Sequence, residues 1–178
     1  FSTENWRRAE EEVSFIMALV ARNLRDQYDF YRENRVRVRH SGDLERLPPA
    51  VRKEITAVTT ETADLDAITV NIAVNYGGRD EIVRAVNRWI GSPDGSGNGS
   101  TTCTEDVICA HLDQPDVPYP DLIIRTGGEK RISNFMLWEC AYAELYFSDT
   151  LWPDWNDADL RFAIEDFRAR KRNYGGMR

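Results

Sequence analysis

Two arginines and a serine follow a short apolar run in the second half of the chain. Residues 121–134 read DLIIRTGGEKRISN, so that Arg125 ends the run and a Gly-Gly pair separates it from Arg131 and Ser133. Forked guanidinium donors match the oxygens of a phosphate group, and charge-assisted hydrogen bonds are the strong ones. Glycines also allow a close approach of the backbone. The pattern predicts a strand that delivers these side chains to a phosphate or a diphosphate.

The alternative is a surface turn whose arginines are solvated or paired with carboxylates. The chain carries 30 Asp and Glu against 23 Lys and Arg, which gives a formal net charge of −7 and many acidic partners. The same charge argues against a nucleic-acid-binding protein, because such proteins depend on a broad basic surface. A local basic pocket for a small anion remains compatible with it.

Other common site chemistries are not indicated. Cys103, Cys109 and Cys140 form no CxxC pair, which is typical of reduced thiols in a cytosolic protein. His40 and His111 are too few and too far apart for a histidine-based metal site. The sequence has neither a GxGxxG nor a GxxxxGK[ST] motif, and no apolar run is long enough to span a membrane.

Alternating helix and strand patterns surround the arginine block. Helical spacing covers residues 10–34, 49–63, 80–90, 105–112 and 157–173. Strand patterns cover residues 36–40, 68–74 and 122–124, and residues 135–147 indicate a helix followed by a short strand. One face of the first helix is apolar, with Val13, Ile16, Met17, Val20 and Leu24.

These patterns predict an α/β fold with a mostly parallel sheet flanked by helices, in a single domain over residues 1–178. Residues 68–74 form a nearly continuous apolar run, as expected of a strand covered on both faces. Residues 91–103, rich in Gly and Ser, are expected to be a flexible loop. Ligands bind at the carboxyl ends of parallel strands, so residues 1–8, 75–79 and 125–133 are expected at one edge.

Four segments in order resemble the cis-prenyltransferase family, which includes the undecaprenyl and other polyprenyl diphosphate synthases. They are residues 1–8 (FSTENWRR), 71–82 (NIAVNYGGRDEI), 125–134, and 138–153 with its terminal Trp-Pro. The resemblance implies an undecaprenyl diphosphate synthase-like fold with an apolar tunnel, usually in a homodimer. It implies that isopentenyl diphosphate is condensed onto an allylic diphosphate such as farnesyl or geranyl diphosphate, with release of diphosphate and formation of a (Z)-polyprenyl diphosphate.

The resemblance also implies roles for individual residues. Asn5 matches the asparagine implicated in removing a proton from isopentenyl diphosphate. Glu144 matches an acidic position associated with Mg²⁺, the implied cofactor. The substrate-binding positions are Ser2, Thr3, Glu4, Trp6, Arg8, Arg125, Arg131, Ile132 and Ser133.

The chemistry fits these residue types. Cleavage of an allylic carbon–oxygen bond leaves negative charge on diphosphate, which cationic donors and a magnesium ion with oxygen ligands stabilise. An amide is hardly protonated near neutral pH, so we expect Asn5 to orient the substrate or to relay the proton to a diphosphate oxygen. Met17, Ala18 and Val20 are candidate tunnel-wall positions, although the same spacing is ordinary in a core.

The chain departs from the family pattern in three places. It lacks the family's amino-terminal strand, with its Asp-containing phosphate loop, and the helix that follows. Ala9 stands where proline is common in the family. Asn173 stands where the family's carboxyl-terminal tail usually has an arginine. We expect a fragment that lacks residues before Phe1, because its start would expose a sheet edge. The alternatives are a noncatalytic partner subunit of a heteromeric prenyltransferase and a generic phosphate-binding protein. We expect a cytoplasmic location, with peripheral membrane association through the product.

Overall fold

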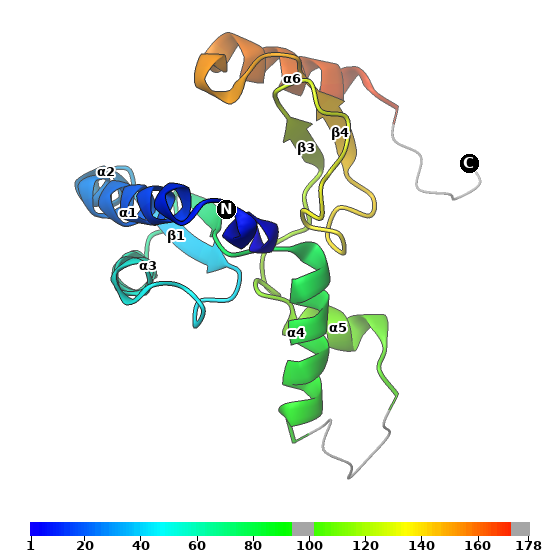
Figure 1. Cartoon of the computed structure of the whole chain (residues 1–178). Helices are drawn as coiled ribbons and strands as arrows, with labels where there is room; N and C mark the ends of the chain where they lie inside the picture. Colours follow the sequence, from blue (N-terminus) through cyan, green and yellow to red (C-terminus); the bar gives the residue numbers. More distant parts are fainter. Residues whose placement is uncertain (94–101, 172–178) are drawn as a thin grey trace. The chain divides into compact units, whose positions relative to one another are not determined.

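The computed structural model describes residues 1–93 and 102–171 and divides into two compact units, Phe1–Val117 and Pro118–Arg178 (Figure 1). The expected flexible loop at residues 91–103 falls mainly on residues 94–101, which lie outside the described residues. The single domain over residues 1–178 remains a prediction.

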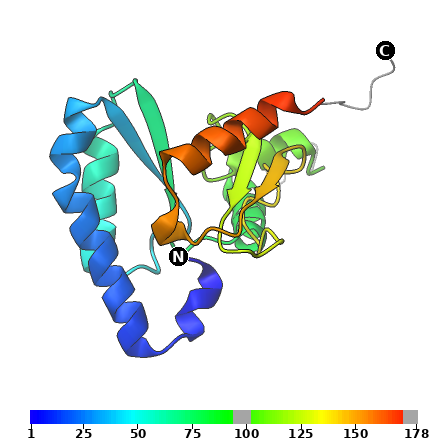
Figure 2. The same cartoon turned by 90° about the horizontal axis from the view of Figure 1, so that it is seen from above.

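The first unit is built on a parallel strand pair with two helices on one side. Strand β1 (Val36–Ser41) pairs with β2 (Ile68–Ala73) in the register Val36↔Ile68 to Ser41↔Ala73. Helices α1 (Glu10–Asp26) and α3 (Pro49–Glu61) lie on the same side of this pair (Figure 2). The other elements of the unit are the 3-10 helix η1 (Thr3–Arg7), α2 (Tyr28–Glu33), α4 (Gly78–Gly91) and α5 (Glu105–His111).

The core of the first unit confirms the predicted apolar face of α1. Val13, Met17 and Leu24 are buried, and Ile16 and Val20 pack against the same cluster. Burying such side chains is the main favourable contribution to folding, at about 25 cal/mol per Å² of apolar surface. This contribution holds α1 and α3 on the strand pair.

Two expectations about the first unit are wrong in part. The helix predicted over residues 10–34 is two helices separated at Gln27, and Tyr28 and Tyr31 of the second helix pack against the core. Strand β2 was expected to be covered on both faces, but Ile68 is 58% exposed. The reason is that α1 and α3 cover only one side of the pair.

The second unit holds another parallel pair. Strand β3 (Leu122–Arg125) pairs with β4 (Glu144–Phe147) in the register Leu122↔Glu144 to Arg125↔Phe147. The 3-10 helix η2 (Trp152–Asp154) and α6 (Asp157–Ala169) follow, and Tyr146 of β4 makes edge contacts with Trp155 and Phe162. The helix expected before β4 is wrong, because residues 133–142 form turns. Residues 172 and 173 of the predicted last helix lie outside the described residues.

Candidate functional site

The segment Phe1–Arg8 lies beyond the carboxyl end of β2. Ser2 forms a parallel bridge with Tyr76, the Tyr76 N–H donates to the Phe1 carbonyl at 3.2 Å, and the Thr3 N–H donates to the Tyr76 carbonyl at 3.0 Å. Phe1 and Ser2 therefore run alongside the chain that leaves β2, and η1 begins where this pairing ends. Within the first unit, residues 1–8 and 75–79 meet at one strand end, as predicted for ligand-binding loops.

The side chains of this segment are held in specific ways. The Asn5 Oδ1 accepts the Ser2 N–H at 2.8 Å, which leaves the Asn5 amide nitrogen as a donor. The Trp6 Nε1 donates to Asn75 Oδ1 at 2.6 Å, and the Trp6 ring contacts the edge of Phe1 at 5.1 Å between centroids. Arg8 donates to Glu12 at 2.6 Å. The Thr3 hydroxyl donates to the Glu4 carboxylate at 3.3 Å.

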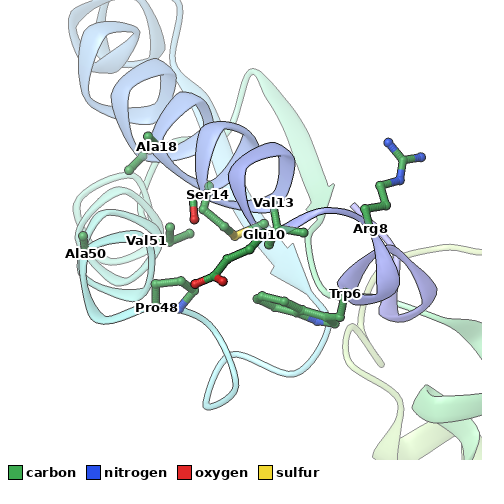
Figure 3. Close-up of a pocket in the computed structure, with 11 residues that line it drawn as sticks. Trp6, Arg8, Glu10, Val13, Ser14, Ala18, Pro48, Ala50 and Val51 are labelled. Atoms are coloured by element: carbon green, nitrogen blue, oxygen red, sulfur yellow. The ribbon is translucent and has the colours of Figure 1, made fainter.

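An apolar cavity of about 530 Å³ opens beside this segment, between η1, α1 and α3 (Figure 3). Its size falls within the range of about 300–1,000 Å³ that is usual for small-molecule sites. Its walls include Trp6 and Arg8 of the candidate set, and also Met17 and Ala18 of the predicted tunnel wall, but not Val20. The remaining lining residues are Glu10, Val13, Ser14, Ala21, Pro48, Ala50 and Val51.

The polar groups of the cavity favour an uncharged, apolar occupant. Figure 3 shows the guanidinium of Arg8 pointing away from the cavity, whereas the Glu10 carboxylate extends toward Pro48 and the Trp6 indole. The negative charge of the Glu10 carboxylate disfavours an anion at this part of the cavity. The cavity is therefore suited to the hydrocarbon part of a ligand, with any diphosphate left outside.

The second unit carries the arginine block at the carboxyl end of β3. Arg125 is the last residue of β3, and its carbonyl accepts the Ser148 N–H at 2.8 Å. Gly127 and Gly128 have φ of 82° and 77°, a left-handed conformation that glycine adopts without steric cost. Their N–H groups donate to the carbonyls of Thr150 and Ser148, at 2.8 and 2.9 Å. These glycines turn the loop back onto residues 148–150, and the close approach of a ligand to their backbone remains a prediction.

The end of this loop has an unusual backbone. Ser133 and Asn134 have φ of 49° and 62°, a region that side chains with a Cβ rarely adopt. Residues held in sparsely populated conformations cost free energy and are concentrated at functional sites. This geometry is consistent with a loop shaped for a ligand around Ile132 and Ser133.

The arginines of the block have different surroundings. Arg131 pairs with Glu129, as the surface-turn alternative expected. Within residues 1–93 and 102–171, Arg125 has no ion-pair partner. No hydrogen bond between described residues joins Arg125 to Arg131 or Ser133, so their convergence on one anion remains a prediction.

The structure does not bring Glu144 to the arginine block. Glu144 begins β4 opposite Leu122, whereas Arg125 ends β3 opposite Phe147, so the two residues lie at opposite ends of the strand pair. The Glu144 carboxylate accepts from Arg170 at 2.9 Å, and Arg170 also donates to Asp166 at 2.6 Å. These hydrogen bonds raise the pKa of Arg170 above its ordinary value.

Sequence reasoning assigned no site role to Asn75. Its amide nitrogen donates to the Asp43 carbonyl at 2.8 Å, while its oxygen accepts from Trp6. The signal for this residue was the polar interruption of an apolar strand just before Gly77-Gly78.

The acids that follow these glycines are structural in the described chain. Asp80 pairs with Arg84 at 2.8 Å, and the buried Glu81 accepts the Tyr76 hydroxyl and the Asp113 N–H. Both acids lie in the first turn of α4, where acidic residues interact favourably with the helix dipole.

Comparisons with known proteins agree with this architecture. A family described as "Putative undecaprenyl diphosphate synthase" matches residues 1–175. An isoprenyl transferase of Treponema denticola is 45% identical over 175 residues, which cover 98% of this chain and 74% of the relative. An isoprenyl transferase of Treponema pallidum is 46% identical over 180 residues, covering 99% of this chain and 77% of the relative.

Solved structures give the same result. A probable undecaprenyl diphosphate synthase from Campylobacter jejuni superposes with a TM-score of 0.87 at 42% identity, covering 99% of this chain and 80% of the other. Lavandulyl diphosphate synthase from Lavandula x intermedia, solved with dimethylallyl diphosphate, gives a TM-score of 0.92 at 30% identity, covering 99% and 76%.

Proposed function

This chain belongs to the undecaprenyl diphosphate synthase family of prenyltransferases, and we propose from that premise that it elongates a prenyl chain in cis. The carbon–oxygen bond of an allylic diphosphate breaks, and a carbon–carbon bond to isopentenyl diphosphate forms. A proton leaves the isopentenyl unit, and diphosphate is released. Farnesyl or geranyl diphosphate is the allylic substrate that we propose.

The observation that carries this proposal is the apolar cavity beside the Ser2–Arg8 segment. Its volume of about 530 Å³ and its wall of Val13, Met17 and Ala18 suit a hydrocarbon chain. An apolar enclosure also keeps water away from the electron-poor allylic carbon, which would otherwise be hydrolysed. Trp6 and Arg8 lie both in this wall and in the candidate substrate-binding set, so the chemistry would occur at the mouth of the cavity.

The polar candidate residues would bind the diphosphate and orient the substrate. Arg125, Arg131 and Ser133 supply donors for the diphosphate of isopentenyl diphosphate, with Arg131 exchanging Glu129 for the ligand. The Asn5 oxygen is occupied by the Ser2 N–H, so Asn5 acts as a donor that orients a substrate oxygen. In this arrangement the proton goes to a diphosphate oxygen, because an amide is too weak a base to hold it.

Magnesium is part of the proposal on chemical grounds, since it shields diphosphate charge and prefers oxygen ligands. It is usually held by one or two carboxylates together with substrate phosphates and water. The described residues contain no group of three or more metal-binding side chains. One oxygen of the Glu144 carboxylate accepts from Arg170, at the far end of the β3–β4 pair from Arg125. We therefore assign no step to the metal, and the role of Glu144 as its ligand remains a prediction.

We also propose a homodimer in the cytoplasm. Tyr142 and Trp152 of the second unit are 81% and 73% exposed, and large exposed aromatic side chains favour a protein partner. Three free cysteines are compatible with a reducing compartment. In the described part of the chain, no helix has the length and apolar character that crossing a membrane requires. Peripheral membrane association would come from the apolar product.

The proposal is tested by incubating the full-length protein with radiolabelled isopentenyl diphosphate, farnesyl diphosphate and magnesium, and by resolving the products by length and double-bond geometry. We expect products with new cis double bonds. Products with only trans bonds, or none, would overturn the proposal. Activity that appears only on addition of a homologous catalytic chain would instead identify a noncatalytic partner subunit.

A further inference from the structure

We propose that Asn75 is a positioning residue that fixes the Trp6 indole and thereby the shape of the cavity mouth. The inference rests on the proposed function, because Trp6 is assigned there to the wall that receives the allylic substrate. Asn75 itself does not line the cavity, so it would act only through Trp6.

The Asn75 side chain is placed to hold two segments at once. It is fully buried, at 0% exposure. Its oxygen accepts the Trp6 Nε1–H at 2.6 Å, and its nitrogen donates to the Asp43 carbonyl at 2.8 Å. A buried amide with both ends bonded resists rotation, because turning it would leave buried polar groups without partners. The indole is therefore attached to a fixed acceptor.

The backbone around Asn75 is equally constrained. Its carbonyl accepts the Asp43 N–H at 3.1 Å. Gly42 lies so close that a Cβ there would approach the Val74 oxygen to 2.2 Å. On the other side, Tyr76 pairs with Phe1 and Thr3, and its hydroxyl donates to the buried Glu81. The acceptor for Trp6 is thus built into the end of β2 and cannot follow the indole if the indole moves.

The conformation of Asn75 explains why an asparagine serves here. Its φ is +55°, in the left-handed region that asparagine, aspartate and glycine tolerate better than other residues. Of these three, only asparagine offers both an acceptor for Trp6 and a donor for Asp43. Glycine at this position keeps the backbone and removes both side-chain hydrogen bonds, which makes Asn75→Gly the informative substitution.

The consequence for the site follows from the position of Trp6. Its ring contacts the edge of Phe1 on one side and lines the cavity with Val13 and Met17. Without the bond to Asn75, the indole can turn about its side-chain bonds and project into the mouth. An allylic substrate then binds less well, whereas the Arg125 block is unchanged.

The experiment compares Asn75→Gly with Asn71→Ala in the full-length protein. Asn71 is the control, because it is also an asparagine, lies on β2, and its amide donates to the Ser41 hydroxyl at 2.8 Å rather than holding Trp6. We expect Asn75→Gly to raise the KM for farnesyl diphosphate about five- to tenfold, the effect of one neutral hydrogen bond. The KM for isopentenyl diphosphate should stay constant, and Asn71→Ala should alter neither constant.

A second readout does not depend on turnover. The Trp6 indole N–H gives an NMR resonance that Trp6→Phe identifies, and we expect it to shift and to lose hydrogen-exchange protection in Asn75→Gly but not in Asn71→Ala. If Asn75→Gly fails to fold, Trp6→Phe removes the same hydrogen bond from its other end. It should then raise the KM for farnesyl diphosphate by a similar factor.

Two results would overturn the inference. One is an unchanged Trp6 resonance in Asn75→Gly, and the other is a rise in both KM values together. The double variant Asn75→Gly, Trp6→Phe should bind farnesyl diphosphate no worse than either single variant, because each single variant already removes the Trp6–Asn75 hydrogen bond. If the wild-type protein makes no product, the proposed function fails. In that case, the Trp6 N–H resonance and the affinity for farnesyl diphosphate, measured by titration of each variant, still test the role of Asn75.

Discussion

Arg84 of α4 donates hydrogen bonds from two guanidinium nitrogens to the carboxylate of Asp113. Arg88 adds a third bond at 2.6 Å, and the Gly42 N–H donates to the same carboxylate at 2.8 Å. The Asp113 side chain is only 4% exposed. Although burial alone would raise its pKa, the hydrogen bonds from Arg84 and Arg88 hold the pKa of Asp113 below its ordinary value. One carboxylate thus joins α4, the turn after β1 and the segment after α5.

Asp113→Asn should therefore destabilise the first unit strongly. Breaking a buried ion pair costs up to about 3–5 kcal/mol in the free energy of unfolding, and we expect a loss toward the lower end because Arg84 keeps its pair with Asp80. Asp66→Asn is the matched control, since Asp66 pairs with Arg35 but both side chains are more than 60% exposed. An exposed pair contributes about 0–1 kcal/mol. Urea unfolding of both variants checks this, and equal effects would contradict it.

Acid should destabilise the protein through His40. Its Nε2 donates to the Val74 carbonyl at 2.9 Å, and burial lowers its pKa below the ordinary value. The unfolded chain therefore binds this proton at a higher pH than the folded chain. The stability contribution is full above the unfolded pKa of about 6.5 and is lost as pH falls toward the folded pKa. In His40→Gln, the melting temperature should depend less on pH between about pH 7 and 5. An unchanged dependence would show that His40 is not the group responsible.

A larger side chain at Ala18 should shorten the product. Ala18 lines the cavity on α1, so Ala18→Leu fills part of the space that the growing chain would occupy. Asn23→Leu adds apolar bulk at an exposed position of the same helix that does not line the cavity. Thin-layer separation of radiolabelled products should show shorter chains for Ala18→Leu only. Identical product lengths in both variants would show that the growing prenyl chain does not enter this cavity.

Much of this arrangement was predictable because it depends on local patterns. The apolar spacing of α1 and the strand patterns at residues 36–40 and 122–124 are signals that the structure reproduces. The break at Gln27 carries no proline or glycine, and the residues after it, Tyr28 and Tyr31, pack against the core. Packing of this kind is a tertiary effect that propensity does not record.

The site was less predictable than the fold. The family resemblance identified Trp6 and Arg8, which the structure places in one cavity wall. It could not identify the partners of these residues, since the Trp6–Asn75 bond joins positions 69 residues apart. Similarly, no sequence pattern shows that Arg131 pairs with Glu129, whereas Arg125 has no ion-pair partner among residues 1–93 and 102–171. Such choices depend on where side chains meet after folding.

Replacing Arg125 should weaken the binding of isopentenyl diphosphate. Arg125→Lys keeps the charge but loses the planar fork, and hydrogen bonds to charged groups contribute about 1.5–3 kcal/mol. We expect the KM for isopentenyl diphosphate to rise about tenfold or more. Arg161→Lys, at an exposed position of α6, is the control and should have no effect. A rise in the KM for the allylic substrate alone would assign Arg125 to the wrong diphosphate.

Asn5 offers a test of how the proton is handled. Its oxygen accepts the Ser2 N–H, so Asn5→Asp keeps this cap of η1 and loses only the amide donor, whereas Asn5→Ala loses both. If the donor orients the substrate, kcat should fall about a hundredfold in both variants, the usual cost of misplacing a reacting group. Single-turnover rates measured across pH separate the possibilities. If Asn5→Asp retained the wild-type rate, the cap rather than the donor would be the contribution of Asn5. If Asn5→Asp became faster as its carboxylate ionised, a base at this position would take the proton, and the transfer to diphosphate oxygen would be wrong.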